Sequence, residues 1–229
     1  SIKDDTSGGD SNNDGTTTKP ARGDWDHIHF YGPTTSTLNY CIIKYAGSST
    51  GGSIFCDENG GPANPTIQNT TITEGSHAGV YVDASSPTLN NVTISNHTNY
   101  PIWINCLGTP NCSNITFTNN GSNGIGVSGG DMSGDRTWSN PGYPYIITGN
   151  ISILDIWTIN QGVILKMAAN VELYIYGYYQ GGKLVADGSI SDPIIFTSLK
   201  DDNYGGDTNK DSNTTLPATG DWDHIHFYG

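Results

Sequence analysis

The stretch PTIQNTTI (residues 65–72) decides the fold, because it returns along the chain at a nearly constant interval. It reappears as PTLNNVTI (87–94), 22 residues later, and as CSNITF (112–117) after about 23 more. A partner segment keeps the same period, as VYV (80–82), IWI (102–104) and IGV (125–127). Each segment alternates apolar and polar residues, which is typical of a strand with one buried face. Two short strands in each interval predict a coil.

One such coil cannot bury its apolar face alone, but coils stacked at the spacing of neighbouring strands bury it continuously. We therefore predict an all-β parallel β-helix, a solenoid with strands and turns and no helical periodicity. In this register Asn69, Asn91 and Asn114 lie above one another at a bend. Stacked Asn side chains pass amide hydrogen bonds from coil to coil, whereas Asn used only as a turn residue predicts no alignment.

A much longer period encloses this short one. The segment GDWDHIHFYG occurs at residues 23–32 and again at 220–229, and residues 1–32 match residues 198–229 at 23 of 32 positions with a constant offset of 197. A copy at a fixed period indicates an array. We expect a β-helix module at 1–136 with an acidic insertion at 1–22, the opening coils of the next module at 137–197, and a second copy of residues 1–32 at 198–229. At 22 or 23 residues per coil, one period predicts eight or nine coils and roughly 40 Å of rod.

The composition excludes several classes of partner. The formal net charge is −13 and the isoelectric point is near 4.4, so nucleic acid and anionic membranes are poor partners. No apolar run approaches the length of a membrane span. The acidic residues are 19 Asp and 3 Glu, and Asp is the one that favours turns and calcium loops.

The strongest local motif is an acidic loop with the pattern of a calcium site. Residues 10–15 read D-x-N-x-D-G, and the copy keeps D-x-N-x-D at 207–211. Oxygens at alternate positions of a tight turn are the first half of a calcium loop. Ala21 and Ala218 stand where an EF-hand has its bidentate Glu, so an EF-hand is excluded. The alternative is a solvated turn with no ion. The predicted calcium ligands are Asp5, Asp10, Asn12 and Asp14, and in the copy Asp202, Asp207, Asn209 and Asp211.

The four cysteines allow three pairings. Cys106 and Cys112 bracket a short loop, so we predict a disulfide between them. Cys41 and Cys56 are then either a second disulfide or buried free thiols, because both lie in apolar strand contexts. Two disulfides would indicate an oxidising, extracellular setting. The N-x-S/T sequons taken as candidate glycosylation sites are at Asn69, Asn91, Asn96, Asn111, Asn114, Asn150 and Asn213.

The repeated strand carries two outward histidines. Strand alternation sends Ile28 and Phe30 to one face and His27 and His29 to the other, and His224 and His226 are their copies. Three interpretations remain open for this pair: a metal site completed by a third ligand such as Asp26, a contact between subunits or modules, or plain surface.

The chain resembles the right-handed parallel β-helix repeats of large bacterial and archaeal extracellular proteins. The resemblance lies in GGKLVADGSISDPIIFTSLKDDNYGGDTN (181–209), in the Pro-containing approach to GDW, and in the rungs that begin P-T-I or P-T-L. It implies a right-handed coil about an apolar core and a place at the cell surface. The same architecture carries adhesins, surface-layer-like proteins, sugar lyases and phage tailspikes, so it does not fix a function.

We therefore expect a non-catalytic structural repeat of a cell-surface fibre, filament or adhesin stalk, stabilised by calcium. Its expected partners are copies of itself, end to end and also side by side. One alternative is a glycan-binding adhesin face. A second is a polysaccharide lyase or hydrolase, for which Asp131, Asp135 and Arg136 form the best local cluster, although a turn explains those residues as well.

Overall fold

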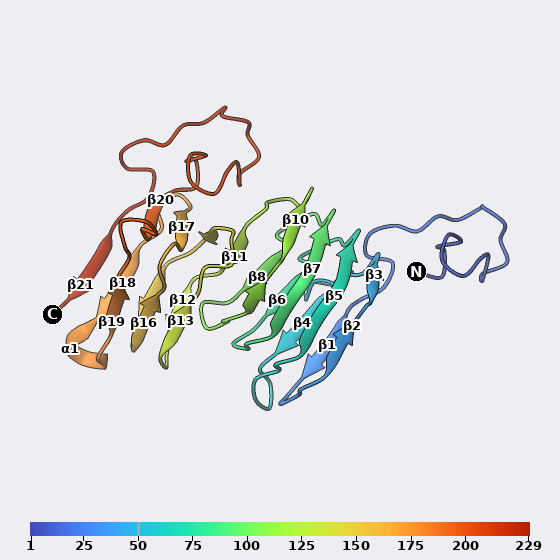
Figure 1. Cartoon of the computed structure of the whole chain (residues 1–229), viewed down its shortest axis with the longest axis horizontal. Coiled ribbons are helices and arrows are strands. Elements are labelled where there is room, and N and C mark those ends of the chain that lie inside the picture. The colour runs from blue at the N-terminus through green and yellow to red at the C-terminus, as the bar shows by residue number, and fades with distance from the viewer. Residues whose placement is uncertain (50) are drawn as a thin grey trace.

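The chain folds into one parallel β-solenoid (Figure 1), and the computed structural model describes residues 1–49 and 51–229. An eight-stranded sheet runs along its whole length. No helix among these residues is long and apolar enough to span a membrane. The strands of this sheet, in spatial order, are β1 (Ile28–Tyr31), β4 (Ile54–Asp57), β6 (Val80–Val82), β8 (Ile102–Ile104), β11 (Ile125–Val127), β14 (Tyr145–Ile147), β17 (Ile164–Met167) and β20 (Ile195–Ser198).

Three further sheets complete the coil, and the registered strand pairs are parallel. The six-stranded sheet contains β2 (Thr37–Asn39), β3 (Ile42–Lys44), β5 (Thr66–Thr73), β7 (Thr88–Ser95), β9 (Asn111–Ser113) and β10 (Thr116–Thr118). The four-stranded sheet contains β12 (Gly130–Met132), β15 (Ile151–Ile153), β18 (Leu173–Tyr176) and β21 (Ile225–Tyr228). The three-stranded sheet contains β13 (Arg136–Trp138), β16 (Ile156–Ile159) and β19 (Lys183–Ala186), and α1 (Gly177–Gln180) is a single helical turn.

The register confirms the short period in the middle of the solenoid. Val80 pairs with Ile102, and Ile102 pairs with Ile125, so one coil spans the interval at which the motif recurs in the sequence. The next coils are slightly shorter, because Ile125 pairs with Tyr145 and Tyr145 with Leu165, and the eight-stranded sheet continues past the predicted boundary at 136–137. The expectation of eight or nine coils per period was wrong. There are about seven, because the long segment between β20 and β21 adds residues without adding a rung.

The core is a continuous column of inward side chains. Ile67 pairs with Leu89, and Ile72 pairs with Ile94, so aliphatic residues stack directly from coil to coil. A fully buried residue of this size contributes on the order of 2 kcal/mol through removal of apolar surface from water. Aliphatic side chains of this column with no exposed surface include Ile54, Ile67, Ile72, Val80, Val82, Leu89, Ile94, Ile102, Ile104, Ile125, Val127, Ile147, Ile151, Ile153, Leu165 and Leu173.

An asparagine ladder follows the bend of the six-stranded sheet. The Asn91 amide donates to Oδ1 of Asn69 at 2.8 Å, and the Asn69 amide donates to Oδ1 of Asn39 at 2.9 Å. The prediction of a ladder through Asn69 and Asn91 is confirmed, and Asn39 extends it by one coil. The prediction that Asn114 continues the ladder from Asn91 was wrong, because the Asn114 amide donates to Oδ1 of Asn90 at 3.4 Å. Asn69, Asn91 and Asn114 all have positive φ, a conformation that Asn adopts more readily than most residues.

The predicted disulfides are absent, and all four cysteines are free thiols. Cys106 follows β8 of the eight-stranded sheet, whereas Cys112 lies in β9 of the six-stranded sheet and pairs with Leu89. Cys56 lies in β4 beside Val82, while Cys41 lies between β2 and β3. The coil therefore places the members of each predicted pair on different faces. Burial raises the pKa of Cys56 and Cys112 to about 12 and that of Cys106 to about 11, so these thiols act as small core residues.

Truncating one rung of the core should destabilise the whole solenoid. Ile94→Ala removes a fully buried side chain that pairs with Ile72 and Phe117, and we expect a loss of about 2 to 5 kcal/mol in the free energy of unfolding. Equilibrium unfolding in urea measures this loss. Thr118→Ala, an exposed position on the next strand, is the control and should change stability by less than about 0.5 kcal/mol. Equal effects of the two substitutions would contradict the packing described here.

Candidate cation sites in the two acidic loops

Two long loops project from the solenoid, one near each end of the chain (Figure 1). Acidic loop 1 is residues 1–22, ahead of β1, and acidic loop 2 is residues 199–219, between β20 and β21. The two loops are copies of one another at the offset of 197. They contain all eight predicted calcium ligands.

Acidic loop 1 is organised by two aspartates that accept backbone hydrogen bonds. The two carboxylate oxygens of Asp10 accept the N–H groups of Asp14 at 3.0 Å and Gly15 at 2.9 Å. Oδ2 of Asp14 accepts the Asn12 amide at 3.0 Å and the N–H of Thr18 at 3.2 Å. These bonds close a tight turn, as Asp and Asn do in turns generally.

Acidic loop 2 repeats this arrangement in a different environment. Asp207 accepts the N–H groups of Asp211 at 3.2 Å and Ser212 at 3.0 Å. Oδ2 of Asp211 accepts the Asn209 amide at 2.9 Å and the N–H of Thr215 at 3.1 Å. The turn therefore depends on its own residues, because it forms in the same way in both places.

In both loops carboxylate oxygens converge, and some buried oxygens of each loop lack donors. The carboxylates of Asp5, Asp10 and Asp14 each offer an oxygen, and these oxygens lie within 4.8 Å of one another; Asp202, Asp207 and Asp211 do the same. Buried oxygens without a hydrogen-bond partner in the described residues are Oδ1 of Asp5, Asn12 and Asp14 in loop 1, and both carboxylate oxygens of Asp202 with Oδ1 of Asn209 in loop 2. Such oxygens accept only, so a cation is the group that would satisfy them.

The electrostatics of loop 1 point in the same direction. The pKa of Asp5 is raised, first by desolvation and then by the negative charges of Asp10 and Asp14. Like charges held this close disfavour ionisation unless a counter-charge lies among them. Asp4, one residue away, differs because it accepts hydrogen bonds from Thr6 and Lys44, which lower its pKa to about 2. Lys44 therefore neutralises Asp4 and leaves the Asp5 cluster uncompensated.

Loop 2 lies on the outer face of the eight-stranded sheet and covers a lysine there. Lys166 of β17 has no exposed surface, and its amine donates to the carbonyl oxygen of Gly206 at 2.6 Å and to Oγ1 of Thr208 at 3.1 Å. Desolvation lowers the pKa of Lys166, while Asp202 and Asp201 act in the opposite direction. The amine thus contributes positive charge beside the cluster but donates to neutral oxygens. No sequence pattern indicated this contact, because Lys166 and Thr208 are 42 positions apart.

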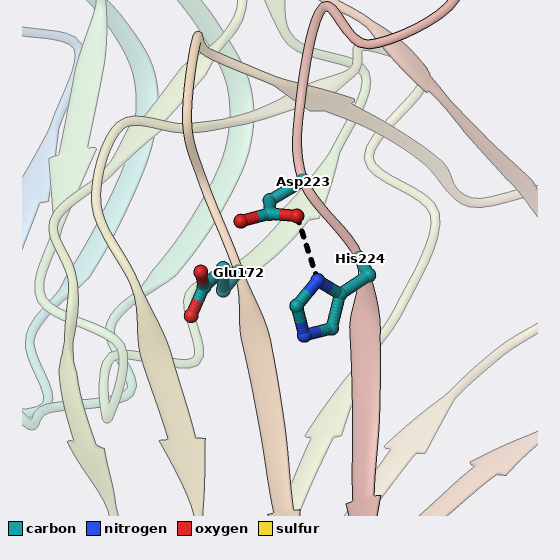
Figure 2. Close-up of side chains that lie close together, drawn as sticks. All are labelled: Glu172, Asp223 and His224. Atoms are coloured by element: carbon teal, nitrogen blue, oxygen red, sulfur yellow. Dashed lines mark hydrogen bonds and ion pairs between the residues drawn. The ribbon is translucent and has the colours of Figure 1, made fainter.

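A third group of possible metal ligands lies where the second copy meets the preceding rung. Figure 2 shows Glu172 facing Asp223 and His224, with Nδ1 of His224 at 2.7 Å from Oδ1 of Asp223. One ligand atom from each of the three residues lies within 4.8 Å of the others. A hydrogen bond to Asp223 is the main reason that the pKa of Glu172 is raised, and burial adds to it. A hydrogen bond between the two carboxyl groups would account for this contact without a metal. Sequence reasoning missed Glu172 because three strands, β18, β19 and β20, separate it from Asp223 along the chain.

The histidine pairs lie on the outer face, as strand alternation predicts. The ring centroids of His27 and His29 are 5.2 Å apart, and Nε2 of His29 is 3.0 Å from Oδ2 of Asp57. His29 stacks on Phe55, which stacks on Tyr81. In the copy, His226 stacks on Tyr228, and His224 lies in the group with Glu172. Both pairs therefore belong to aromatic clusters on the outside of the coil.

The residues considered for catalysis are spread over two strands and the turn between them: Asp131 lies in β12, Arg136 begins β13, and Asp135 lies in the turn. Oδ1 of Asp135 accepts the N–H of Ile156 at 3.2 Å, and Asp155 of the next coil accepts the N–H of Gly134 at 2.7 Å. Among the seven candidate glycosylation sites named above, four use the amide nitrogen that would carry a glycan as a hydrogen-bond donor to a neighbouring coil: Asn69, Asn91, Asn96 and Asn114. The other three, Asn111, Asn150 and Asn213, are exposed.

Comparison with known proteins agrees with this architecture. A family model described as "Right handed beta helix region" matches residues 11–160, which is more than half of the chain. The chain therefore belongs to the right-handed β-helix family, and the predicted handedness and fold class are confirmed. No curated protein matched the sequence, and no solved structure matched it.

The aspartate that closes each loop should make stability depend on pH. Asp221 accepts hydrogen bonds from Lys200 at 2.6 Å, from the N–H of Ala218 at 2.8 Å and from Ser198 at 2.7 Å. These bonds lower the pKa of Asp221 to about 2. Asp24 accepts the corresponding bonds in the first copy, and its pKa is also about 2. A depressed carboxyl pKa contributes stability that is present above the unfolded value, about 4, and lost as the pH falls towards about 2.

We expect the double variant Asp24→Asn, Asp221→Asn to be less stable than the parent at pH about 5, and to lose less stability between pH about 4 and about 2. Urea midpoints across this range measure the effect. Asp187→Asn, an exposed aspartate outside the loops, is the control and should follow the parent. Parallel curves for the parent and the double variant would show that these carboxylates are not held as described.

Proposed function

We propose that the chain is a structural, non-catalytic repeat of an extracellular fibre, filament or adhesin stalk. The observation that carries the proposal is the copy at offset 197, in which residues 198–229 rebuild the loop and strand of residues 1–32 at the far end of the solenoid. A repeat whose loop and first strand occur again after 197 residues is suited to an array. The extracellular location rests on the resemblance and on the exposed sequons, since the free thiols remove the argument from disulfides.

Calcium is the proposed stabilising ion, with one ion in each acidic loop. The support is the set of unpartnered buried oxygens, which recur in the two copies at Asp5 and Asp202 and at Asn12 and Asn209. Carboxylate and amide oxygens are the ligands that calcium prefers. Bound calcium would hold each loop in one conformation and offset the repulsion around Asp5 and Asp202. A stiff loop lying on the sheet resists bending of the rod better than a mobile one.

The ion can be tested by titration and by thermal melting. We expect isothermal titration with calcium to give two ions per chain and chelator to lower the melting temperature, because a ligand that binds only the folded state adds about 2.7 kcal/mol of stability at 100 times its dissociation constant. Asp202→Asn should remove one ion, Asp5→Asn the other, and Asp187→Asn neither. A melting temperature that does not respond to chelator, with no heat of binding, would reject the ion.

The rod can be tested by imaging. Protein carrying many 197-residue repeats should appear by electron microscopy as an unbranched rod that lengthens by roughly 35 Å per repeat, since about seven coils stack at 4.8 Å. Globules joined by flexible linkers would reject the proposal.

A further inference from the structure

We propose, resting on the array proposed above, that residues 198–229 seat the first coil of a following copy, and that each copy is turned by about one third of a revolution relative to the one before. The same sequence, IHFY, forms β1 and β21. Yet β1 begins the eight-stranded sheet, whereas β21 ends the four-stranded sheet. If β21 is the β1 of the next copy, the four-stranded sheet of one copy continues as the eight-stranded sheet of the next.

The strand edges on either side of this junction match. In the described part of the chain β19, β20 and β21 each end a sheet, so their outer edges present unpaired backbone groups. Chain order around the coil then places β20 beneath β3 of the following copy. The first copy already shows this neighbourhood, because Ser1, the equivalent of Ser198 in β20, lines the same surface hollow as Ile42 and Lys44 of β3.

The outer aromatic columns also join across the junction. On the near side, Tyr174 of β18 registers with His226 of β21. On the far side, His29, the equivalent of His226, registers with Phe55, and Phe55 with Tyr81. Combining the two halves gives a column that passes through the histidine without a gap. The histidine is therefore a rung of the column, shared by the two copies.

Each half of the chain supplies one support of the acidic loop. The first copy shows the support from the following coil, where Lys44 donates to Asp4 at 3.0 Å. The second copy shows the support from the preceding coil, where Lys166 donates to the loop backbone. Asp201, the equivalent of Asp4, accepts hydrogen bonds from Thr197 and Asn203 in the described part of the chain. In an array every loop has both lysines, one from each neighbouring coil.

The proposed rotation follows from the different sheets to which β1 and β21 belong. In the second half of the chain each coil contributes one strand to each of three sheets. The sheet that β21 joins is the one that follows the eight-stranded sheet in chain order. Acidic loops of successive copies therefore lie on successive corners, and three copies carry them once around the rod. Side-by-side contacts made by these loops would be spaced every third copy along any one side.

The test uses a two-repeat chain, residues 1–229 followed directly by residues 33–229. Hydrogen exchange at residues 225–228 of the first repeat should slow by at least tenfold relative to the parent chain, because these amides gain a strand neighbour. Exchange within β7, which is internal in both chains, is the control. Asp201→Asn should raise the unfolding equilibrium constant roughly fivefold in the two-repeat chain. That effect should vanish in a background that already carries Lys44→Met in the second repeat.

Rotation is measured by helical reconstruction of longer arrays from electron micrographs. A turn of about one third of a revolution per copy is expected. Acidic loops aligned on one side would overturn the proposed rotation, but they would not contradict the proposal that the copies form a rod. Two separate unfolding transitions of the two-repeat chain, with no protection of residues 225–228 from hydrogen exchange, would overturn both the proposed pairing of successive copies and the proposed rod. A single transition with no coupling between Asp201 and Lys44 would overturn the loop support.

Discussion

The structure depends on one constraint, which is that a strand in this coil pairs only with the coil above and the coil below. Within a coil, consecutive strands share no ladder bonds, so an isolated coil would leave its backbone N–H and C=O groups unpaired. The same stacking buries the apolar column, because Ile72 covers Ile94 and Ile94 covers Phe117. Hydrogen bonding and burial are therefore satisfied by the same neighbours, and each coil is stable only as part of a stack.

This constraint leaves the corners free to vary. Only the strand residues enter the ladders, so a loop can be inserted between β20 and β21 without disturbing the rungs on either side. The inserted loop covers the buried Lys166 and accepts a hydrogen bond from its amine. A single amine cannot balance the aspartates of the loop, and it donates to a carbonyl and a hydroxyl rather than to the carboxylates. This uncompensated charge is what the proposed calcium ion would offset.

Much of the fold could be predicted because the period of the sequence is the period of the structure. The spacing of the rungs, the inward aliphatics and the bend at Asn69 and Asn91 all follow from local alternation and repetition. The disulfides could not be predicted from spacing, because the short loop between Cys106 and Cys112 is enough to carry the chain to another face. The candidate calcium ligands are a prediction from their motif, whereas the contacts of Lys166 and Glu172 join distant segments that no local pattern encodes.

The number of coils in a repeat has a consequence for the shape of an array. From β1 to β20 the eight-stranded sheet gains seven strands, and β21 then lies one face further along the chain. One period thus contains seven whole coils and one additional face. A whole number of coils would place each copy directly above the last, and the extra face is what turns it. Lengthening the loop between β20 and β21 would leave this remainder unchanged, because the loop contains no strand. The rotation is therefore set by how many faces the strands of a repeat cover, and the acidic loop can evolve without altering it.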